Sequence, residues 1–533
     1  MRNSSLSRRR VAATALASLG LVAAQCATPV LTISTANRNF GSVAPGASAT
    51  RTFVVTNTGG FDALLRDVST AGVALATPFS VSGGSCATGA SVPVNGSCTI
   101  DVRFSPTTLS FADDRIELKY NWLNSNQPDL TVRSTMVGNA TGTAAQLTSG
   151  RDHACILTAA GAVRCWGENG FGALGYGNRE HIGDDEFPGS VGNVSVGGTV
   201  MRLESHYWRT CAILSNGALR CWGLNQYGEL GYGVTEQNIG DDELPSSAGD
   251  VLVGAAVQSV AIGDYHVCAL LTNGNVRCWG HNGSGQLGLG HTRTIGDDEP
   301  PSSGGDVEVG GRVLQLIAGG THTCALLDAG RVRCWGFNGG ALGYGHNRNI
   351  GDDETPASAG DVPVGGKVTQ LTAGDAHTCA LLDTGAVRCW GNSRWGRLGY
   401  GNEAVIGDDE TPASVGDVNV GGKVAQIDAG GEHTCAVLTT GAVRCWGSNV
   451  MGELGYGHTF WLGSEQPPAA FGDVSVGTPV RHIEVGFAHT CALLTTGKVR
   501  CWGFGGLGVV GQGSPENIGD NELPSSVGDI PLY

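Results

Sequence analysis

The sequence predicts an all-β protein in which a seven-bladed β-propeller follows a smaller antiparallel β-sandwich. Pairs of cysteines recur at a constant spacing through residues 145–533. Alternating strand patterns, separated by Gly, Asn and Pro turns, fill residues 28–142. The composition agrees, because 86 glycines and 15% charged side chains in 533 residues are typical of loop-rich β structure and not of disorder.

The first 24 residues predict a signal peptide. Residues 8–10 are arginines, and they precede an apolar run over residues 11–24 that ends in Val22-Ala23-Ala24. Small residues at these places are typical of a signal-peptidase site, here before Gln25. We therefore expect a secreted protein, extracellular or periplasmic, and leave this segment out of the fold.

The sequence leaves two other routes of export open. A lipid anchor on Cys26 would tie the mature protein to a membrane, although Gln25 is an unfavourable neighbour for a lipidated cysteine. Ser7-Arg8-Arg9 also fits a twin-arginine signal. No later run approaches the roughly 18 apolar residues of a membrane helix, so we expect no membrane span.

Charge and cysteine content narrow the choice of partner and compartment. A formal net charge of −16 argues against nucleic acid and anionic membranes, because both would repel the protein. A neutral or cationic protein surface is easier to accommodate. Seventeen cysteines beside a signal peptide indicate a disulfide framework in an oxidising compartment.

Fourteen of these cysteines form seven pairs, each with nine residues between the partners, and successive pairs recur every 55 to 57 residues. Repeats of this length, built of short strands, are typical of propeller blades, and seven such units can close a ring. The pairs are Cys155 and Cys165, Cys211 and Cys221, Cys268 and Cys278, Cys324 and Cys334, Cys379 and Cys389, Cys435 and Cys445, and Cys491 and Cys501.

One repeat, residues 424–447, shows how such a pair would bond. It reads as a strand, a Gly-bearing loop, a second strand, a three-residue turn and a third strand. That turn places Cys435 directly opposite Cys445, where antiparallel Cα atoms lie about 4.5 to 5.5 Å apart and a disulfide fits. Asp-Val-x-Val segments such as 417–420 and 473–476 predict a fourth strand. Zinc is the alternative for paired cysteines, but this spacing lacks the close pairs of zinc knuckles.

Three strings recur in the repeats: G-x-x-H-T-C-A-L-L, then G-x-V-R-C-W-G, then N-x-x-G-x-L-G-Y-G. They resemble the repeat of the regulator of chromosome condensation family, whose members are seven-bladed propellers. The likeness spans about residues 145–533 and recurs seven times. Cys and Arg stand where that family usually has apolar, small or aromatic residues, as expected of an extracellular version.

The N-terminal region carries a second resemblance. Its phrases read Phe40-Gly-Ser-Val-Ala-Pro-Gly, Val55-Thr-Asn-Thr-Gly and Cys98-Thr-Ile-Asp-Val-Arg-Phe-Ser-Pro. They are similar to the immunoglobulin-like domain of the abnormal-spindle and hydin type, which implies an immunoglobulin-like β-sandwich over residues 28–142. Cys86 and Cys98 are expected to form the eighth disulfide, which leaves Cys26 over.

Symmetry separates residues that build a blade from residues that bind a partner, because a residue present in every blade is expected to be structural. One tryptophan follows the second cysteine of each pair, and we interpret the seven as packing between blades: Trp166, Trp222, Trp279, Trp335, Trp390, Trp446 and Trp502. Six histidines stand two residues before the first cysteine, with Arg209 in this place in the second blade: His153, His266, His322, His377, His433 and His489. We interpret them as hydrogen-bonded structural groups, since catalysis needs one placed base with a tuned pKa.

An arginine precedes the second cysteine of every pair: Arg164, Arg220, Arg277, Arg333, Arg388, Arg444 and Arg500. An Ile-Gly-Asp-Asp-Glu loop recurs at 182–186, 239–243, 295–299, 350–354 and 406–410, with Asp520-Asn521-Glu522 last. We expect these acids to pair with the arginines or to cap turns within or between blades. Calcium is the alternative, but the loops lack alternating Asp-x-Asp geometry. We predict no other metal or cofactor.

A partner site is expected where the repeats differ. The Gly-x-x-His and Asn-x-x-Gly loops of an antiparallel blade emerge on one rim, where blades five, six, seven, one and two carry large apolar side chains. Blades three and four carry mainly Ser, Gly and Thr, with Tyr265 as the exception. Aromatic residues and Met are enriched in interface cores, which predicts a protein-binding arc. Its residues are Phe171, Tyr207, Trp208, Tyr227, Trp395, Met451, Phe460, Trp461, Phe487 and Leu507.

The leading functional hypothesis is a secreted, monomeric protein-binding or adhesion scaffold without enzyme activity, whose rim binds a protein or a surface glycan. An enzyme inhibitor is one alternative, because propeller-type β-lactamase inhibitor proteins resemble this repeat and bind through an aromatic-rich rim. Guanine-nucleotide exchange, the activity of the family's namesake, is another, but export and eight disulfides speak against it. No catalytic motif such as H-E-x-x-H, G-x-S-x-G or a phosphate loop occurs in the sequence.

Overall fold

The computed structural model describes residues 28–34, 39–43, 47–70, 79–105, 111–122, 129–139 and 144–532. The predicted signal peptide and Cys26 lie outside these residues, and so does the predicted junction of the two domains at 140–143. Within the described part of the chain, helices are short turns, and none is long and apolar enough to cross a membrane.

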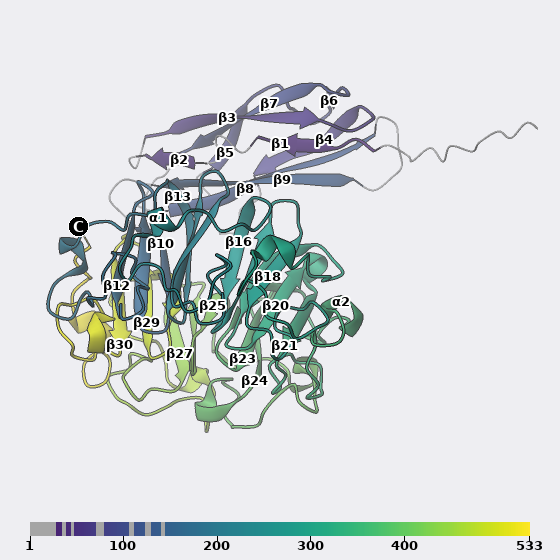
Figure 1. Cartoon of the computed structure of the whole chain (residues 1–533). Helices are drawn as coiled ribbons and strands as arrows, with labels where there is room; N and C mark the ends of the chain where they lie inside the picture. Colours follow the sequence, from purple (N-terminus) through teal and green to yellow (C-terminus); the bar gives the residue numbers. More distant parts are fainter. Residues whose placement is uncertain are drawn as a thin grey trace, which may run out of the picture. The chain divides into compact units, whose positions relative to one another are not determined.

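Nine strands form the predicted β-sandwich (Figure 1), in two sheets with the orders β1-β3-β7-β5 and β2-β9-β8-β4-β6. Along β3, Phe53, Val55 and Asn57 are buried and alternate with more exposed residues, as on a strand with one face against a core. β2 pairs parallel with β9, which departs from the antiparallel prediction. Cys86 and Cys98 are bonded as expected, with Cα atoms 5.1 Å apart. The strands are β1 (Leu31–Ile33), β2 (Asn39–Ser42), β3 (Ala49–Asn57), β4 (Ala63–Thr70), β5 (Phe79–Gly83), β6 (Ser91–Val92), β7 (Ser97–Phe104), β8 (Phe111–Trp122) and β9 (Leu130–Asn139).

Seven three-stranded antiparallel sheets follow and form the blades of the predicted propeller. The first strands of neighbouring blades pack against one another, and β28 of blade seven packs against β10 of blade one, so the ring closes. The first strands are β10 (Ala144–Ser149), β13 (Val200–His206), β16 (Val257–Ile262), β19 (Val313–Ala318), β22 (Val368–Ala373), β25 (Val424–Ala429) and β28 (Val480–Val485).

The second and third strands of each blade form the hairpin that the cysteine spacing predicts. The second strands are β11 (His153–Thr158), β14 (Arg209–Leu214), β17 (His266–Leu271), β20 (His322–Leu327), β23 (His377–Leu382), β26 (His433–Leu438) and β29 (His489–Leu494). The third strands are β12 (Val163–Gly167), β15 (Leu219–Gly223), β18 (Val276–Gly280), β21 (Val332–Gly336), β24 (Val387–Gly391), β27 (Val443–Gly447) and β30 (Val499–Gly503).

Short helical turns connect the strands, most of them with proline in the first position, where its missing N–H costs nothing. They are η1 (Pro188–Ser190), α1 (Pro245–Ala248), η2 (Pro301–Ser303), η3 (Asp328–Gly330), α2 (Pro356–Ala359), η4 (Arg394–Gly396), α3 (Pro412–Val415), η5 (Pro468–Ala470), η6 (Gly506–Gly508) and η7 (Pro524–Ser526).

The predicted fourth strand is wrong for most of its length. In blade five, Val418 forms a single bridge to Val387 of the third strand. The next possible ladder bond is lost because the Val420 N–H turns back to the Val418 carbonyl oxygen, 2.9 Å away. A bond between residues i and i+2 is a γ-turn, which bends the chain out of the sheet. The same i to i+2 bond recurs at Val196, Val253, Val309, Val364 and Val476.

The seven cysteine pairs lie directly opposite one another across the second and third strands, as predicted. Their Cα atoms are 4.0 to 4.1 Å apart, closer than the expected range. All fourteen cysteines are buried. Eight bonded pairs in one chain indicate an oxidising environment.

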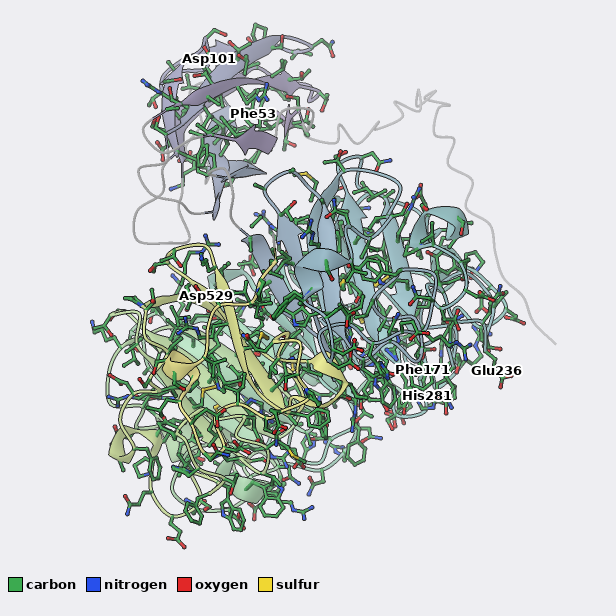
Figure 2. The ribbon with its side chains drawn as sticks, turned by 90° about the vertical axis from the view of Figure 1, so that its left-hand side faces the viewer. Phe53, Asp101, Phe171, Glu236, His281 and Asp529 are labelled. Atoms are coloured by element: carbon green, nitrogen blue, oxygen red, sulfur yellow. A yellow bond between two sulfur atoms is a disulfide. The ribbon has the colours of Figure 1, made fainter. Side chains whose placement is uncertain are left out.

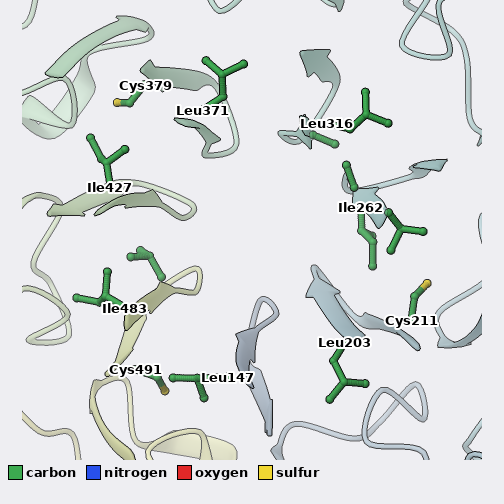
Figure 3. Close-up of a cluster of buried hydrophobic side chains, with 14 of the residues drawn as sticks. Leu147, Leu203, Cys211, Ile262, Leu316, Leu371, Cys379, Ile427, Ile483 and Cys491 are labelled. Atoms are coloured by element: carbon green, nitrogen blue, oxygen red, sulfur yellow. The ribbon is translucent and has the colours of Figure 1, made fainter. Parts of the chain in front are cut away.

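The seven tryptophans pack between blades, as predicted. Trp222 Nε1 donates a hydrogen bond of 2.9 Å to the Ala173 carbonyl oxygen of the preceding blade, and Trp166 Nε1 donates to Val509 at 3.0 Å across the ring closure. The other five indoles donate in the same way. Figure 3 shows buried aliphatic side chains that the first strands carry around the ring, such as Leu203 and Leu371.

We expect the double variant Cys435→Ala, Cys445→Ala to lower the free energy of unfolding of the propeller by about 3 kcal/mol, because the disulfide closes a loop of about 11 residues in the unfolded chain. Guanidinium unfolding followed by tryptophan fluorescence measures the change. The matched variant Cys86→Ala, Cys98→Ala removes the sandwich disulfide and should leave the propeller transition in place. Equal midpoints for the blade variant and the wild type would contradict the expectation.

Candidate interaction face and channel mouth

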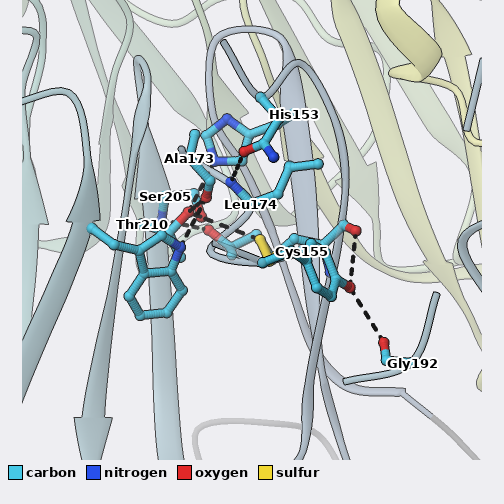
Figure 4. The surroundings of a disulfide bond; sticks show 12 residues. His153, Cys155, Ala173, Leu174, Gly192, Ser205 and Thr210 are labelled. Atoms are coloured by element: carbon cyan, nitrogen blue, oxygen red, sulfur yellow. Dashed lines mark hydrogen bonds between the residues drawn. A yellow bond between two sulfur atoms is a disulfide. The ribbon is translucent and has the colours of Figure 1, made fainter. Parts of the chain in front are cut away.

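The buried histidines form hydrogen bonds between blades. His153 Nε2 lies 2.9 Å from Thr210 Oγ1 of the next blade, and this hydroxyl donates to the Ala173 carbonyl oxygen (Figure 4). Burial, together with the nearby His489, lowers the pKa of His153 to about 3, so the imidazole is neutral. The contact recurs between His266 and Thr323, His322 and Thr378, His377 and Thr434, and His433 and Thr490. These bonds bear out the structural interpretation for five of the six histidines; His489 makes no such contact, since blade one has Ala154 in place of the threonine.

Blade two departs from this pattern. The next blade has Val267 where five of the other blades have threonine, and Arg209 replaces the histidine. Arg209 is fully buried and pairs with the buried Glu229 at 3.2 Å. It also donates to the carbonyl oxygens of Gly263, at 3.0 Å, and Asp264. Arg209 therefore fixes the loop of blade three that carries Asp264.

The blade arginines do not pair with the Ile-Gly-Asp-Asp-Glu loops, so that prediction is wrong. Arg220 shows the observed pattern: its Nε lies 2.8 Å from Asp250 of the Asp-Val-x-Val segment, and its Nη1 donates to the Val196 carbonyl oxygen of the preceding blade. Asp250 stands directly before Val251, whose N–H donates to the Leu219 carbonyl oxygen at 2.8 Å, and this bond holds Asp250 beside Arg220. The other partners are Arg164 with Asn193, Arg277 with Asp306, Arg333 with Asp361, Arg388 with Asp417, Arg444 with Asp473 and Arg500 with Asp529.

The Ile-Gly-Asp-Asp-Glu loops instead join neighbouring blades through backbone hydrogen bonds of their glycines, and not through the predicted capping by the acidic side chains. The Gly177 N–H donates to the Gly240 carbonyl oxygen at 3.0 Å, and Gly513 donates to Gly183 at 2.9 Å across the ring closure. Equivalent bonds join Gly290 to Gly351, Gly345 to Gly407, Gly401 to Gly463 and Gly457 to Gly519. Within each of at least four of these loops, carboxylate oxygens of the three acidic residues lie within 4.8 Å of one another. Calcium binding there stays a prediction.

The Gly-x-x-His and Asn-x-x-Gly loops share one rim, as predicted, because their aromatic rings touch. The ring centroids of Phe171 and Trp208, one from each kind of loop, lie 5.0 Å apart. Trp208 contacts Tyr207 at 4.2 Å, Tyr207 contacts Tyr265 at 5.3 Å, and Tyr265 contacts Tyr227 at 5.3 Å. These five residues form a continuous surface over blades one to three, the first aromatic patch.

An arginine and a phenylalanine extend the first aromatic patch toward blade seven. The Arg151 guanidinium carbon lies 3.8 Å from the ring centroid of Phe487, 5.5 Å from that of Tyr207 and 5.3 Å from that of Trp208. Contacts of this kind are cation–π interactions, which are strongest where water is excluded. Arg151 thus adds a positive charge to an aromatic surface.

A second aromatic patch lies on blades five and six and consists of Trp395, Phe460 and Trp461. The two indole centroids are 4.9 Å apart, and the Arg394 guanidinium carbon is 4.7 Å from the Trp395 ring. Phe460 is 73% exposed and Trp461 is 48% exposed. Exposure of this extent for neighbouring large aromatic side chains is typical of a surface that a partner covers.

Three of the predicted rim residues have a left-handed backbone conformation. The φ angles are 52° at Tyr207, 64° at Trp395 and 60° at Leu507. This conformation costs an L-residue roughly 1–2 kcal/mol. In the described propeller, the other non-glycine residues with positive φ are Glu236 and Ala329. Strain of this kind clusters at functional sites, where the surrounding structure enforces it.

The predicted arc is too narrow, because blades three and four also contribute. Tyr265 belongs to the first aromatic patch, and the His281 ring centroid lies 4.9 Å from that of Tyr227. Phe337 of blade four is 51% exposed. The prediction compared the residue before the second glycine of the Asn-x-x-Gly loop, whereas His281 and Phe337 precede the asparagine, where a comparison of blades would have found them.

The remaining predicted rim residues lie in the loops of blades six and seven. Met451 is partly buried, and its sulfur accepts a weak hydrogen bond from Asn517 Nδ2 at 3.8 Å. Leu507 is 36% exposed. Figure 2 shows Phe171 and His281 at the same end of the propeller, away from Asp529, which pairs with Arg500.

Three carboxyl groups interact at equivalent positions of the first strands, along the central channel. Burial raises the pKa of Glu484 to about 8, and burial together with the Glu484 charge raises the pKa of Asp428 to about 7. The pKa of Glu204 is raised well above its usual range for the same two reasons. Asp428 accepts hydrogen bonds from Thr372 Oγ1 at 2.9 Å and from the Val485 N–H at 2.7 Å.

Comparison with protein families agrees with this architecture. The regulator of chromosome condensation (RCC1) repeat matches residues 144–173, 257–286, 315–347, 368–396, 424–453 and 480–509, and a second description of the same repeat matches 216–270, 273–326 and 384–437. The chain belongs to the RCC1 repeat family. Residues 29–135 match the HYDIN/CFA65/VesB-like Ig-like domain, which confirms the immunoglobulin-like character of the sandwich.

The chain is similar in sequence to curated proteins of several different kinds. The ultraviolet-B receptor UVR8 of Arabidopsis thaliana is 30% identical over 373 residues, which are 69% of this chain and 78% of UVR8. The secretion-regulating guanine nucleotide exchange factor of Bos taurus is 26% identical over 379 residues, which are 67% of this chain and 77% of that protein. The human E3 ubiquitin-protein ligase HERC2 is 28% identical over 57% of this chain and 6% of its own length.

Solved structures agree on the fold. The crystal structure of human WBSCR16 has a TM-score of 0.52 at 19% identity and covers 68% of this chain and 92% of its own. Yeast RCC1 (Prp20), crystallised with Kap60, has a TM-score of 0.50 at 19% identity and covers 64% and 78%. At this identity the likeness concerns the RCC1 propeller fold alone.

We expect Asp428→Asn to stabilise the RCC1 propeller at alkaline pH. A carboxyl with a higher pKa in the folded than in the unfolded chain contributes stability below about pH 4, and this contribution is lost as the pH rises through about 7. An amide cannot ionise, so the variant should melt about 1–3 °C above the wild type at pH 8.5 and within error of it at pH 3.5. Calorimetry at both pH values measures the difference.

Asp383→Asn, in an exposed turn, is the matched control and should melt like the wild type at both pH values. A lower melting temperature of Asp428→Asn at pH 8.5 would show instead that the ionised carboxylate and its two hydrogen bonds stabilise the channel.

Proposed function

We propose that this RCC1 propeller is a non-enzymatic scaffold that binds a partner protein through its aromatic rim. The observation that supports it most directly is the strained backbone that holds Tyr207, Trp395 and Leu507 on the rim face. Ordinary loop packing does not require large side chains at positions where glycine costs less. Selection for an exposed aromatic surface gives a reason for the strain.

The chemistry of the rim favours a protein partner. Aromatic rings with arginines beside them are the side chains that dominate interface energies, and here Arg151 and Arg394 each lie over rings. The net charge of −16 would attract a cationic partner over a long range, while these arginines supply local positive charge among the rings. A surface glycan that stacks on Trp395 and Trp461 is the alternative ligand for the second aromatic patch.

The compartment follows from the disulfides. Eight bonded pairs fit an oxidising environment, and with the apolar N-terminal segment they support export of the protein, free or anchored through Cys26. A monomer needs no second chain to complete the ring, because Trp166 already closes it. The exchange activity named for the bovine relative is not proposed, since it rests on family likeness alone.

We expect the triple variant Trp208→Ala, Trp395→Ala, Trp461→Ala to bind the partner at least about tenfold more weakly than the wild type, because both aromatic patches lose anchors. Partners are first identified by cross-linking on the immobilised mature protein, and the affinity of each purified partner is then measured by biolayer interferometry.

The matched control changes three exposed aliphatic residues outside the aromatic patches, Leu252→Ala, Leu314→Ala and Val415→Ala, and should bind like the wild type. Unchanged affinity of the tryptophan variant for every partner would overturn the proposal, provided that its melting temperature matches that of the control. Binding of oligosaccharides alone, lost in the same variant, would favour a glycan over a protein.

A further inference from the structure

We propose that His206, Asp264 and Asp375 bind one divalent metal ion of the zinc type at the mouth of the central channel. His206 Nε2 lies 3.3 Å from Asp264 Oδ1, and one ligand atom from each of the three side chains falls within 4.8 Å of the others. Bonds of about 2.1 Å from one ion place neighbouring ligand atoms about 3.0–3.4 Å apart. The three ligand atoms therefore need to move little to bind one ion.

The three residues meet because the Gly-x-x-His loops surround the channel axis. Backbone hydrogen bonds tie the loops to one another: Arg151 N–H to Tyr207 (2.6 Å), Asp264 N–H to Gly320 (3.2 Å) and Gly320 N–H to Asp375 (3.1 Å). Loops so connected hold their side chains in fixed positions, which is what a metal site requires.

Blade two carries a coupled pair of substitutions that creates the histidine ligand. His206 stands where other blades have glycine, and Arg209 stands where they have histidine. At Gly150 an added Cβ would lie 2.1 Å from His153 Cε1, and the same clash of 2.0–2.3 Å occurs at Gly263, Gly319, Gly374 and Gly486. A side chain at this position therefore meets the neighbouring histidine ring in five blades, and at Gly374 and Gly430 it also meets a backbone carbonyl oxygen of the next blade. Arg209 removes the clash and admits His206.

The structure also leaves room for the ion and fixes its second ligand. A small cavity of about 10 Å³, close to the space that one water molecule needs, lies beside the cluster; His206, Asp375 and Arg151 line it, whereas Asp264 does not. At Gly320, a Cβ would lie 3.0 Å from Asp264 Oδ2, so glycine keeps this carboxylate unobstructed. Arg209 holds the loop of Asp264 through two carbonyl oxygens.

The two carboxylates differ in their partners. Asp264 Oδ1 is paired with His206 Nε2. Among the described residues, Asp375 has no salt bridge and its carboxylate accepts no hydrogen bond, so its oxygens are available to an ion. A divalent cation would neutralise both carboxylates. One imidazole with two carboxylates suits Zn²⁺ or a similar transition metal, and calcium, which prefers oxygen alone, less well.

The inference is independent of partner binding at the aromatic patches and is tested with the metal alone. The mature protein is stripped with a chelator, dialysed and titrated with Zn²⁺ by calorimetry, and we expect one ion per chain. His206→Gln and Asp375→Ala should each weaken Zn²⁺ binding at least about tenfold. Asp352→Ala, in an acidic loop of blade four, is the matched control and should leave binding unchanged.

Cobalt supplies a second readout. Co²⁺ in the site should show visible absorption that His206→Gln abolishes and Asp352→Ala preserves. Wild-type affinity in both ligand variants, or no Zn²⁺ uptake by the wild type, overturns the proposal. If Asp375→Ala does not fold, Asp375→Asn keeps the shape of the side chain and removes its charge, and the same tenfold loss is expected of it.

Discussion

The hydrogen bond between each blade tryptophan and the preceding blade is the contact on which the rest of this propeller depends. Trp222 Nε1 donates a hydrogen bond to the carbonyl oxygen of Ala173, two residues before Gly175 in the same loop. A Cβ at Gly175 would lie 2.8 Å from that nitrogen, so only glycine lets the indole come this close. The bond ties the buried core of one blade to the Asn-x-x-Gly loop of its neighbour. The Asn-x-x-Gly loops are therefore held by the core of the next blade as well as by their own asparagine, such as Asn169, which accepts a hydrogen bond from the Leu174 N–H, so the residues in between can differ between blades.

Much of the fold could be predicted because its determinants are local and repeated seven times. The distance between Cys435 and Cys445 along the chain sets the hairpin, and the position of Trp446 sets its contact with the preceding blade. The fourth strand was the weaker inference. Its alternating valines fit a strand. The side-chain pattern does not reveal that a backbone N–H, such as that of Val420, donates to the carbonyl oxygen two residues earlier.

Partners far apart in the sequence were harder to predict. Arg220 had two acidic candidates in its repeat, and sequence alone favoured the Ile-Gly-Asp-Asp-Glu loop over the single Asp250. The structure decides for Asp250 because the bond from the Val251 N–H to Leu219 holds it beside the arginine. The rim residues were predicted from differences between blades, and the structure brings most of them together. His206 escaped notice because only its neighbour at position 209 was compared across the blades.

A difference between one blade and the others is stronger evidence for a functional site when the substitution destabilises the fold more. An exposed loop can exchange serine for tryptophan at little cost, so aromatic loops alone are modest evidence for a site. The exchange of glycine for His206 is different, since in five of the other six blades a Cβ at this position would clash with the histidine three residues later. That replacement buries a guanidinium, which is tolerated only because Glu229 and backbone carbonyl oxygens accept its hydrogen bonds. Several linked changes in one blade, each unfavourable alone, are hard to explain by drift between equivalent repeats. They indicate that the position of His206 at the channel mouth was itself selected.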